Sequence, residues 1–301
     1  MRRSIIMMVI AVMLLGIGCD QGQEPAVTES PYEGGSQGLL ANFEEFGVEE
    51  DGMATIFSDE TFPVEITLKN KGEEDIPAGA VEITLKGVSP NDFDGMVFED
   101  TNDDELEKVS EFAPEGGEET VDMGDASYAI ELAGSYYDAT VFASIAYPYQ
   151  THAAVPRVCF NTEPTDTTVC TLEGKKTVYS SGAPVKVTAA REARAGANLI
   201  AVEFDVENVG GGDVTKPGEE FDNRYDQILF SLDDTSDPGM WECRLGGEEN
   251  GGRLVDGKGT IRCKLVNPME EDTMYTKQLD LTISYDYKFL IEQSIRIKKN
   301  V

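Results

Sequence analysis

The sequence is short of the side chains that most catalytic and metal sites use. Its 301 residues include one histidine, one tryptophan and five cysteines. Histidine is the side chain that titrates nearest neutral pH, so general acid–base chemistry has few candidates here. The chain also lacks a G-x-S-x-G elbow, a P-loop, an H-E-x-x-H pair and a G-x-G-x-x-G motif followed by a helix. We therefore expect a protein that is not an enzyme.

Basic residues are scarce as well. Twenty-four lysines and arginines stand against 57 aspartates and glutamates, for a formal net charge of -33 at pH 7. A surface with this excess of carboxylates repels the phosphate backbone, which argues against nucleic acid as a partner. The carboxylates are also suited to keeping a protein hydrated in salt or away from anionic lipid head groups.

Long apolar runs are confined to the N-terminus. Arg2 and Arg3 precede an uncharged, almost wholly apolar stretch at residues 5–17, which is the layout of a secretory signal. A helix of this length reaches only about 20 Å, short of the roughly 30 Å of a bilayer core. The pattern therefore favours a signal peptide over 1–18 rather than a permanent membrane span.

The apolar run ends in Leu15, Gly16, Ile17, Gly18 and Cys19. This ending resembles the lipobox at which prokaryotic lipoproteins are cleaved and lipidated, although Gly16 stands where that family usually has leucine. The resemblance implies lipid attachment at Cys19 and a membrane-anchored protein outside the cytoplasm; ordinary secretion is the alternative. The polar, Gly- and Pro-containing stretch 19–38 then predicts a flexible tether.

Four cysteines remain in the body of the chain: Cys159, Cys170, Cys243 and Cys263. An even number behind an export signal predicts disulfides, and four cysteines allow three connectivities. The local pairs, Cys159 with Cys170 and Cys243 with Cys263, are favoured because strand-like residues flank a turn-rich centre in each. A zinc site is the rival interpretation, but neither pair has C-x-x-C spacing.

Two sequence patterns recur at one fixed distance. The alternating segments 64–72 and 202–210 both end in Asn-x-Gly, and they lie 138 positions apart. The alternating segments 141–149 and 279–287, which both end in Tyr-x-Tyr, lie the same distance apart. Two matches at one offset predict a duplicated unit, with copies at 39–160 and 175–301 joined by a disulfide hairpin at 161–174.

Both copies have the composition of strands. Short segments rich in Val, Ile, Phe, Tyr and Thr alternate between apolar and polar residues and are separated by Gly, Pro, Asn or Asp. This pattern predicts an all-β protein in which each copy folds as an immunoglobulin-like sandwich of two antiparallel sheets. Residues 103–110 are the exception and are expected to form one or two helical turns within a loop.

The strand that runs into Asn-x-Gly, as at 67–72 and 205–210, resembles the early strand of CARDB-type and related immunoglobulin-like modules. With the lipobox-like cysteine, the polar stalk and the two cysteine pairs, the chain is similar to poorly characterised surface lipoproteins of archaea. The resemblance implies surface display, adhesion or assembly with a protein or glycan partner. It implies no catalytic residue.

Acidic loops are the candidate metal sites. Asp100, Asn102, Asp104 and Glu111 fall at positions 1, 3, 5 and 12 of an EF-hand count. The sixth position is Glu105 where the loop requires glycine, which leaves a looser calcium site or a solvated acidic loop. Asp233, Asp234 and Asp237 form a second cluster, for which turn chemistry is the simpler explanation.

The remaining rare side chains favour structural roles. His152 is expected at a strand edge or in a loop, Trp241 against the nearby disulfide or its sheet, and Tyr136 and Tyr137 at a hairpin turn. We therefore predict an adhesion, interaction or envelope-scaffold module. The alternatives are a surface-layer or filament subunit that self-associates through strand edges, a solute-binding lipoprotein, and an extracellular hydrolase or its accessory domain.

Overall fold

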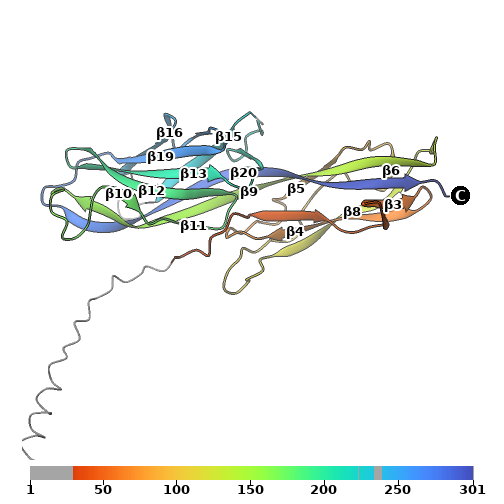
Figure 1. Ribbon diagram of the computed structural model, residues 1–301, viewed down its shortest axis with the longest axis horizontal. Helices are drawn as coiled ribbons and strands as arrows, with labels where there is room; N and C mark the ends of the chain where they lie inside the picture. Colours follow the sequence, from red (N-terminus) through yellow and green to blue (C-terminus); the bar gives the residue numbers. More distant parts are fainter. Residues whose placement is uncertain (1–29, 223, 234–238, 301) are drawn as a thin grey trace, which may run out of the picture. The chain divides into compact units, whose positions relative to one another are not determined.

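Strands form all the regular structure in the computed structural model, which describes residues 30–222, 224–233 and 239–300 (Figure 1). Twenty strands lie in these ranges, and no helix does. The all-β prediction is confirmed. The reason is visible in β4 (Thr61–Asn70), where the buried Val64, Ile66 and Leu68 alternate with more exposed neighbours. Each buried side chain of this size contributes about 1.5–3 kcal/mol.

Two of the three sheets are built from one half of the chain each. The four-stranded sheet has the order β1 (Leu39–Phe43), β4, β8 (Glu118–Tyr128), β6 (Phe93–Asp94). The six-stranded sheet has the order β10 (Gly174–Lys176), β12 (Val185–Gly196), β13 (Leu199–Asn208), β19 (Lys258–Leu265), β16 (Trp241–Leu245), β17 (Glu248–Glu249). Strands β12, β13, β19 and β16 repeat the order of the four-stranded sheet, so the duplication seen in the sequence is also present in the topology.

The third sheet has ten strands and contains both halves of the chain. Its central order is β18 (Gly251–Leu254), β15 (Asp226–Asp233), β20 (Met274–Lys298), β9 (Tyr136–Asn161), β5 (Glu82–Lys86), β7 (Glu99–Thr101). The shorter strands β11 (Tyr179–Ser180) on β9, and β14 (Asp213–Thr215) and β3 (Met53–Phe57) on β20, extend it, with β2 (Val48–Glu50) on β3.

Strands β9 and β20 are the two long strands that join the halves (Figure 1). They pair antiparallel from Tyr136 opposite Lys298 to Asn161 opposite Met274. Pro148 lies opposite Asp286, which is also the residue 138 positions later. The pairing is therefore pseudo-symmetric about this point, and each strand has one half in each repeat.

The pairing of β9 with β20 bears on the predicted boundaries between the two copies. Two separate sandwiches at 39–160 and 175–301 are not confirmed, because one sheet contains strands of both segments and Pro31–Val301 forms a single unit. Within that unit the sheets pack in layers. The ring of Tyr128 on β8 stacks on Tyr137 of β9, with centroids 5.7 Å apart. In the other repeat, Phe160 of β9 meets Trp241 of β16 at 6.0 Å.

Residues 103–110 form no helical turn, so that prediction is wrong. They run as an irregular loop in which Leu106 makes an isolated antiparallel bridge with Ile76. Both side chains are fully buried. Burial of this leucine, together with the backbone bridge, makes the extended loop more stable than a helical turn at the surface would be.

The end of the predicted tether contacts the folded unit. The backbone amides of Glu33 and Gly34 donate to the carboxylate of Glu73 at 3.0 and 2.8 Å. The predicted signal peptide 1–18, Cys19 and most of the tether 19–38 lie outside the described residues. The part of the chain that the structure describes contains no helix long and apolar enough to cross a membrane.

Candidate functional site

Four buried tyrosines lie where the two repeats meet. Tyr149 pairs with Tyr285 across β9 and β20, and Tyr147 pairs with Tyr287. The Tyr149 hydroxyl accepts a hydrogen bond from the Glu74 amide at 3.3 Å, and the Tyr287 hydroxyl accepts one from the equivalent Gly212 amide at 2.7 Å. Burial raises the pKa of all four phenols, so they act as neutral structural groups.

These tyrosines explain the Asn-x-Gly motif. The side-chain amides of Asn70 and Asn208 each donate to the carbonyl four residues later at 2.7 Å, which closes the turn after the strand. A Cβ at Gly72 would overlap the Tyr149 hydroxyl, and one at Gly210 would overlap the Tyr287 hydroxyl. In each repeat, the glycine of the Asn-x-Gly motif therefore makes room for a tyrosine of the Tyr-x-Tyr motif.

An open groove of about 1310 Å³ lies beside the Tyr147 and Tyr287 pair. Its lining comes from the segments 36–40, 209–213 and 220–222, and from 287–290 of β20, with Lys86, Ser144, Tyr147, Pro184 and Arg224. Among the lining residues that the structure describes, Leu290 is 60% exposed and Val209 is 39% exposed. The groove thus combines exposed apolar side chains with glycine segments, which have no side chain to cover their backbone.

Most charged side chains in the groove are paired with each other. The Lys288 ammonium lies 3.3 Å from Asp213 and 4.2 Å from the ring centroid of Phe221. The Arg224 guanidinium bonds the carboxylate of Asp222 and lowers its pKa. Lys86 has no ion pair with any residue of the described ranges. Paired charges beside apolar side chains suit a binding surface better than proton transfer.

The groove continues to an unpaired stretch of β20. On the side of β20 away from β9, β14 pairs with residues 286–288 and β3 pairs with residues 295–298. No strand in the described ranges pairs with residues 289–294 on this side. Leu290 lies in this gap, and both Leu290 and Glu292 are exposed. A central strand of the sheet therefore has an open edge here.

The second repeat fills the equivalent position. Ala153 and Ala154 of β9, which lie 138 positions before residues 291 and 292, pair with Ser180 and Tyr179 of β11. Next to them, Ser181 donates its backbone N–H to the His152 carbonyl at 2.8 Å. Ala153 and Ala154 are almost fully buried as a result. The place that β11 occupies on β9 is open on β20.

The calcium candidates do not converge. Asn102 is buried, and its side-chain oxygen accepts from the Val81 amide at 2.8 Å. Its nitrogen donates to the carbonyls of Pro77 and Asp104 at 2.9 and 2.7 Å. Asn102 is thus a structural anchor for the loop. Residues 30–300 outside the gaps contain no group of three or more His, Cys, Asp or Glu side chains placed to hold a metal.

The same result covers Asp100, Asp104 and Glu111, which the structure does not bring together around a site. One Asp100 oxygen accepts a hydrogen bond from the backbone of Thr101, and Glu111 is exposed. In the second acidic cluster, Asp234 and Asp237 lie outside the described residues, as does the side chain of Asp233.

The rare aromatic and imidazole side chains have packing roles. His152 lies within β9, with its ring nitrogens 3.1 Å from Glu74 and 3.3 Å from Thr282. Trp241 of β16 packs against Phe160 of β9, in the ten-stranded sheet rather than in the sheet that carries Cys243. Tyr136 and Tyr137 begin β9 rather than form a turn. Arg296 lies over the Tyr136 ring at 4.7 Å.

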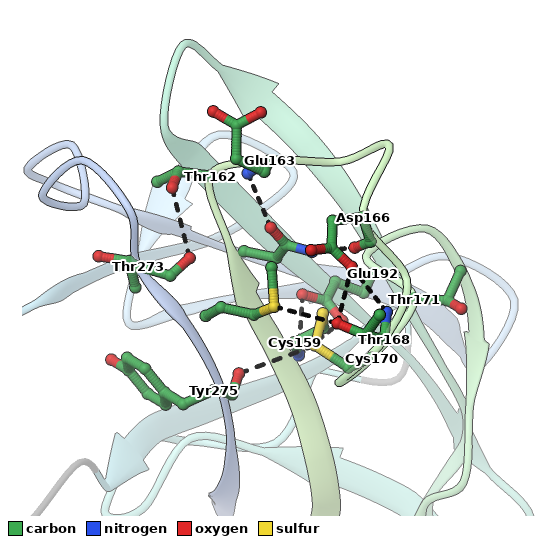
Figure 2. The surroundings of a disulfide bond; sticks show 12 residues. Cys159, Thr162, Glu163, Asp166, Thr168, Cys170, Thr171, Glu192, Thr273 and Tyr275 are labelled. Atoms are coloured by element: carbon green, nitrogen blue, oxygen red, sulfur yellow. Dashed lines mark hydrogen bonds between the residues drawn. A yellow bond between two sulfur atoms is a disulfide. The ribbon is translucent and has the colours of Figure 1, made fainter.

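Both favoured disulfides are present, one between Cys159 and Cys170 and one between Cys243 and Cys263. Cys243 and Cys263 lie directly opposite each other on β16 and β19. Figure 2 shows the first bridge and the Glu192 carboxylate beside it, which accepts the Cys159 amide at 3.0 Å. The first bridge ties β9 to the loop after it, and the second joins two neighbouring strands of the six-stranded sheet.

Glu192 is the most buried carboxylate that the structure describes. Its side chain has no exposed surface, and Lys176 contacts it at 2.7 Å. Burial raises its pKa to about 6, although the hydrogen bond from Lys176 opposes that shift. Lys176 also donates to the carbonyl of Thr171. Glu192 therefore fastens the disulfide hairpin to β12.

The comparisons with known proteins leave the family open. No protein-family description matches the chain, and no curated protein matches it. Among solved structures it is weakly similar to the secreted serine protease VesC from Vibrio cholerae, with 10% sequence identity and a TM-score of 0.23. The similarity covers 83% of this chain and 50% of that chain, so this chain spans about half the length of that protein.

Sequence reasoning missed Leu290, although a signal was present. In 279–288 of β20, every second residue is polar or charged and faces outward. Leu290 continues that outward series as an apolar residue, between Phe289 and Ile291. An exposed leucine at a polar position of a strand is the pattern to search for.

Proposed function

We propose that the protein is an exported, lipid-anchored interaction module of the cell surface that is not an enzyme. In this proposal Cys19 holds the lipid, residues 19–38 form the stalk, and the body consists of two CARDB-like, immunoglobulin-like sandwiches that exchange strands through β9 and β20. The body binds a protein or glycan partner at the surface. The observation that carries the proposal is the groove beside Tyr147 and Tyr287.

Three features support an extracytoplasmic interaction role. Two disulfides suit an oxidising compartment, since thiols in the cytosol are kept reduced. The net charge of -33 suits a hydrated surface. The groove presents Leu290 and Val209 beside ion pairs, as binding surfaces with an apolar centre and a polar rim do.

Location and anchoring are tested on the full-length protein from its own membranes. Intact-mass spectrometry is expected to show loss of residues 1–18, addition of a lipid, and a gain of four hydrogens on reduction. Whole cells treated with an impermeant amine-reactive label are expected to label the protein. Recovery of unlabelled protein with free thiols from the cytosol would overturn this part of the proposal.

Binding is tested with a groove variant and a matched control. Leu290→Glu places a carboxylate in the groove, whereas Val255→Glu places one at a 73% exposed valine that does not line the groove. Immobilised full-length protein is exposed to envelope fragments of its own cells, and retention is measured. We expect loss of retention for Leu290→Glu alone. Equal retention by both variants and the wild type would contradict a groove function.

A further inference from the structure

We propose that the open edge of β20 at residues 289–294 accepts an extended segment of a partner protein as an additional strand. The segment pairs with the backbone of Leu290 and Glu292 and carries an apolar and a basic side chain two positions apart, on the same face as these two residues. This inference rests on the proposed interaction function and specifies its partner. It follows from the comparison of the two repeats, in which one edge is filled and the other is open.

The direction of the backbone groups is set by the repeat. His152 directs its N–H to the Ser181 hydroxyl at 2.9 Å and its carbonyl to the Ser181 amide, both away from β20. Leu290 lies 138 positions later at the equivalent place on β20. Because strand residues alternate in direction, the N–H and C=O groups of Leu290 and Glu292 both point into the gap.

The gap has room for a short strand. Six residues at about 3.4 Å each give an edge of about 20 Å, bounded by β14 at one end and β3 at the other. The groove reaches this edge at Phe289 and Leu290. A bound segment therefore gains main-chain hydrogen bonds from β20 and an apolar contact from Leu290, the two sources of affinity in strand addition.

The chain's own equivalent segment is held elsewhere. In the second repeat, β11 begins six residues before β12. The counterpart of β12 in the first repeat is β1, and the residues six and five positions before β1 are Glu33 and Gly34. Their amides bond the Glu73 carboxylate instead. Glu73 also accepts the Gly182 amide at 2.6 Å, so one carboxylate holds both residues 33–34 and the loop before β12.

Charge selects the class of partner. A second copy would bring another net charge of -33 to the contact, and like charges oppose that association. Glu292 stands exposed in the edge itself. Leu290 and Glu292 lie on the same face of β20, because they are two positions apart. A segment with an apolar residue opposite Leu290 and a lysine or arginine opposite Glu292, two positions along, covers the leucine and complements both the carboxylate and the overall field.

The test uses full-length protein and the fluorescent, end-capped heptapeptide Thr-Val-Thr-Lys-Thr-Val-Thr, which carries its valines and its lysine on one face of an extended strand. Two peptides serve as controls: one with alternate backbone amides N-methylated, and one with glutamate in place of lysine. Binding is measured by anisotropy, and hydrogen exchange is followed at residues 289–294. We expect binding of the Val/Lys peptide only, with slowed exchange in that segment.

Glu292→Pro removes an amide that faces the gap and leaves the pairing with β9 intact, since proline is tolerated at an open strand edge. We expect it to weaken the peptide by about fivefold to tenfold, the effect of one lost hydrogen bond. Glu292→Gln keeps the amide and should reduce affinity less. Leu290→Glu is the second variant if Glu292→Pro does not fold.

The outcomes separate this inference from the function it rests on. Equal binding of the N-methylated peptide, unchanged exchange at residues 289–294, or full affinity in Glu292→Pro would each overturn strand addition. If envelope retention is still lost in Leu290→Glu, the proposed function survives without it. Concentration-dependent oligomers that protect residues 289–294 would identify a second copy as the occupant and contradict our assignment of the partner.

Discussion

At the scale of single residues, the tyrosine hydroxyls contribute more than their burial. The phenol oxygens of Tyr149 and Tyr287 accept backbone amides from the loops that follow the Asn-x-Gly turns. Both amides are partly buried, and a hydrogen bond of this kind contributes about 0.5–1.5 kcal/mol. The corresponding turn of each repeat is therefore stabilised by one tyrosine oxygen.

Replacing Tyr287 with phenylalanine tests this dependence. The hydrogen bond from Gly212 to Tyr287 is 2.7 Å long, whereas the one from Glu74 to Tyr149 is 3.3 Å long. We expect Tyr287→Phe to lower the free energy of unfolding by about 0.5–1.5 kcal/mol, and Tyr149→Phe to lower it by less. Urea denaturation of both variants gives the comparison. An equal or reversed order would show that these bonds do not determine the loss.

Glu192 gives the protein a specific pH dependence. Its folded pKa of about 6 lies above the value of 4.5 expected for the unfolded chain. The folded state therefore binds this proton more tightly, so the carboxyl favours folding at low pH. That contribution is lost as the pH rises through about 6, and the total is about 2 kcal/mol.

The measurement compares wild type with Glu192→Gln, because the many other carboxylates titrate in both proteins. From about pH 5 to about pH 7.5, the unfolding free energy of the wild type should fall by about 1 kcal/mol relative to the variant. Urea titrations at several pH values supply the difference. A difference that stays constant or rises with pH would mean that Glu192 keeps an ordinary or lowered pKa.

At the scale of elements, one disulfide ties β9 to the loop that follows it, and the other joins paired residues of β16 and β19. The bridge from Cys159 to Cys170 closes a separation of 11 residues, and the bridge from Cys243 to Cys263 closes one of 20. Loop-closure entropy in the unfolded chain assigns each bridge about 3 kcal/mol. Neither bridge joins the two repeats.

Removing one bridge at a time tests that assignment. The double alanine variants Cys159/Cys170 and Cys243/Cys263 are each expected to lose about 3 kcal/mol of stability, with the larger loss for the longer loop. Calorimetry of both variants measures the effect. If either variant matches the wild type, its bridge closes a loop that is already ordered in the unfolded chain.

The elements also show how far sequence reasoning reaches. Alternation placed Val64, Ile66 and Leu68 on the buried face of β4 correctly, since a two-residue period fixes which face is apolar. It could not identify the partner of each strand, because pairing depends on segments far away in the chain. Asn102 was assigned to a possible ligand set from spacing alone, and its burial appears only when Pro77 and Val81 come into place.

At the scale of the molecule, the repeat offset predicted the equivalence of the Tyr-x-Tyr segments but not their pairing. Only their Tyr-x-Tyr ends, at 147–149 and 285–287, pair with each other, around Pro148 and Asp286. A copy boundary drawn at 160 assumes that β9 serves one sandwich. The strand is 26 residues long and passes through both repeats, and no local pattern marks the crossing.

The shared strands make a strong prediction about unfolding. Strands β9 and β20 run unbroken through both repeats, and within each repeat their two halves pair with each other. Unfolding of one repeat therefore leaves the paired strands of the other with frayed, unsupported ends. We therefore expect one cooperative transition in urea, with no intermediate that retains one repeat. Trp241 fluorescence reports the second repeat, and far-ultraviolet circular dichroism reports all strands. The two curves should coincide in midpoint and slope.

Shortening β20 tests the same coupling from one end. A chain that stops after Lys288 loses the part of β20 that pairs with β3 and with residues 136–145 of β9, all in the first repeat. If the repeats are coupled, the Trp241 transition also moves to lower urea, although no contact of Trp241 is removed. An unchanged Trp241 midpoint, or two separate transitions in the full chain, would mean that each repeat is stable alone and that the long strands join two independent folds.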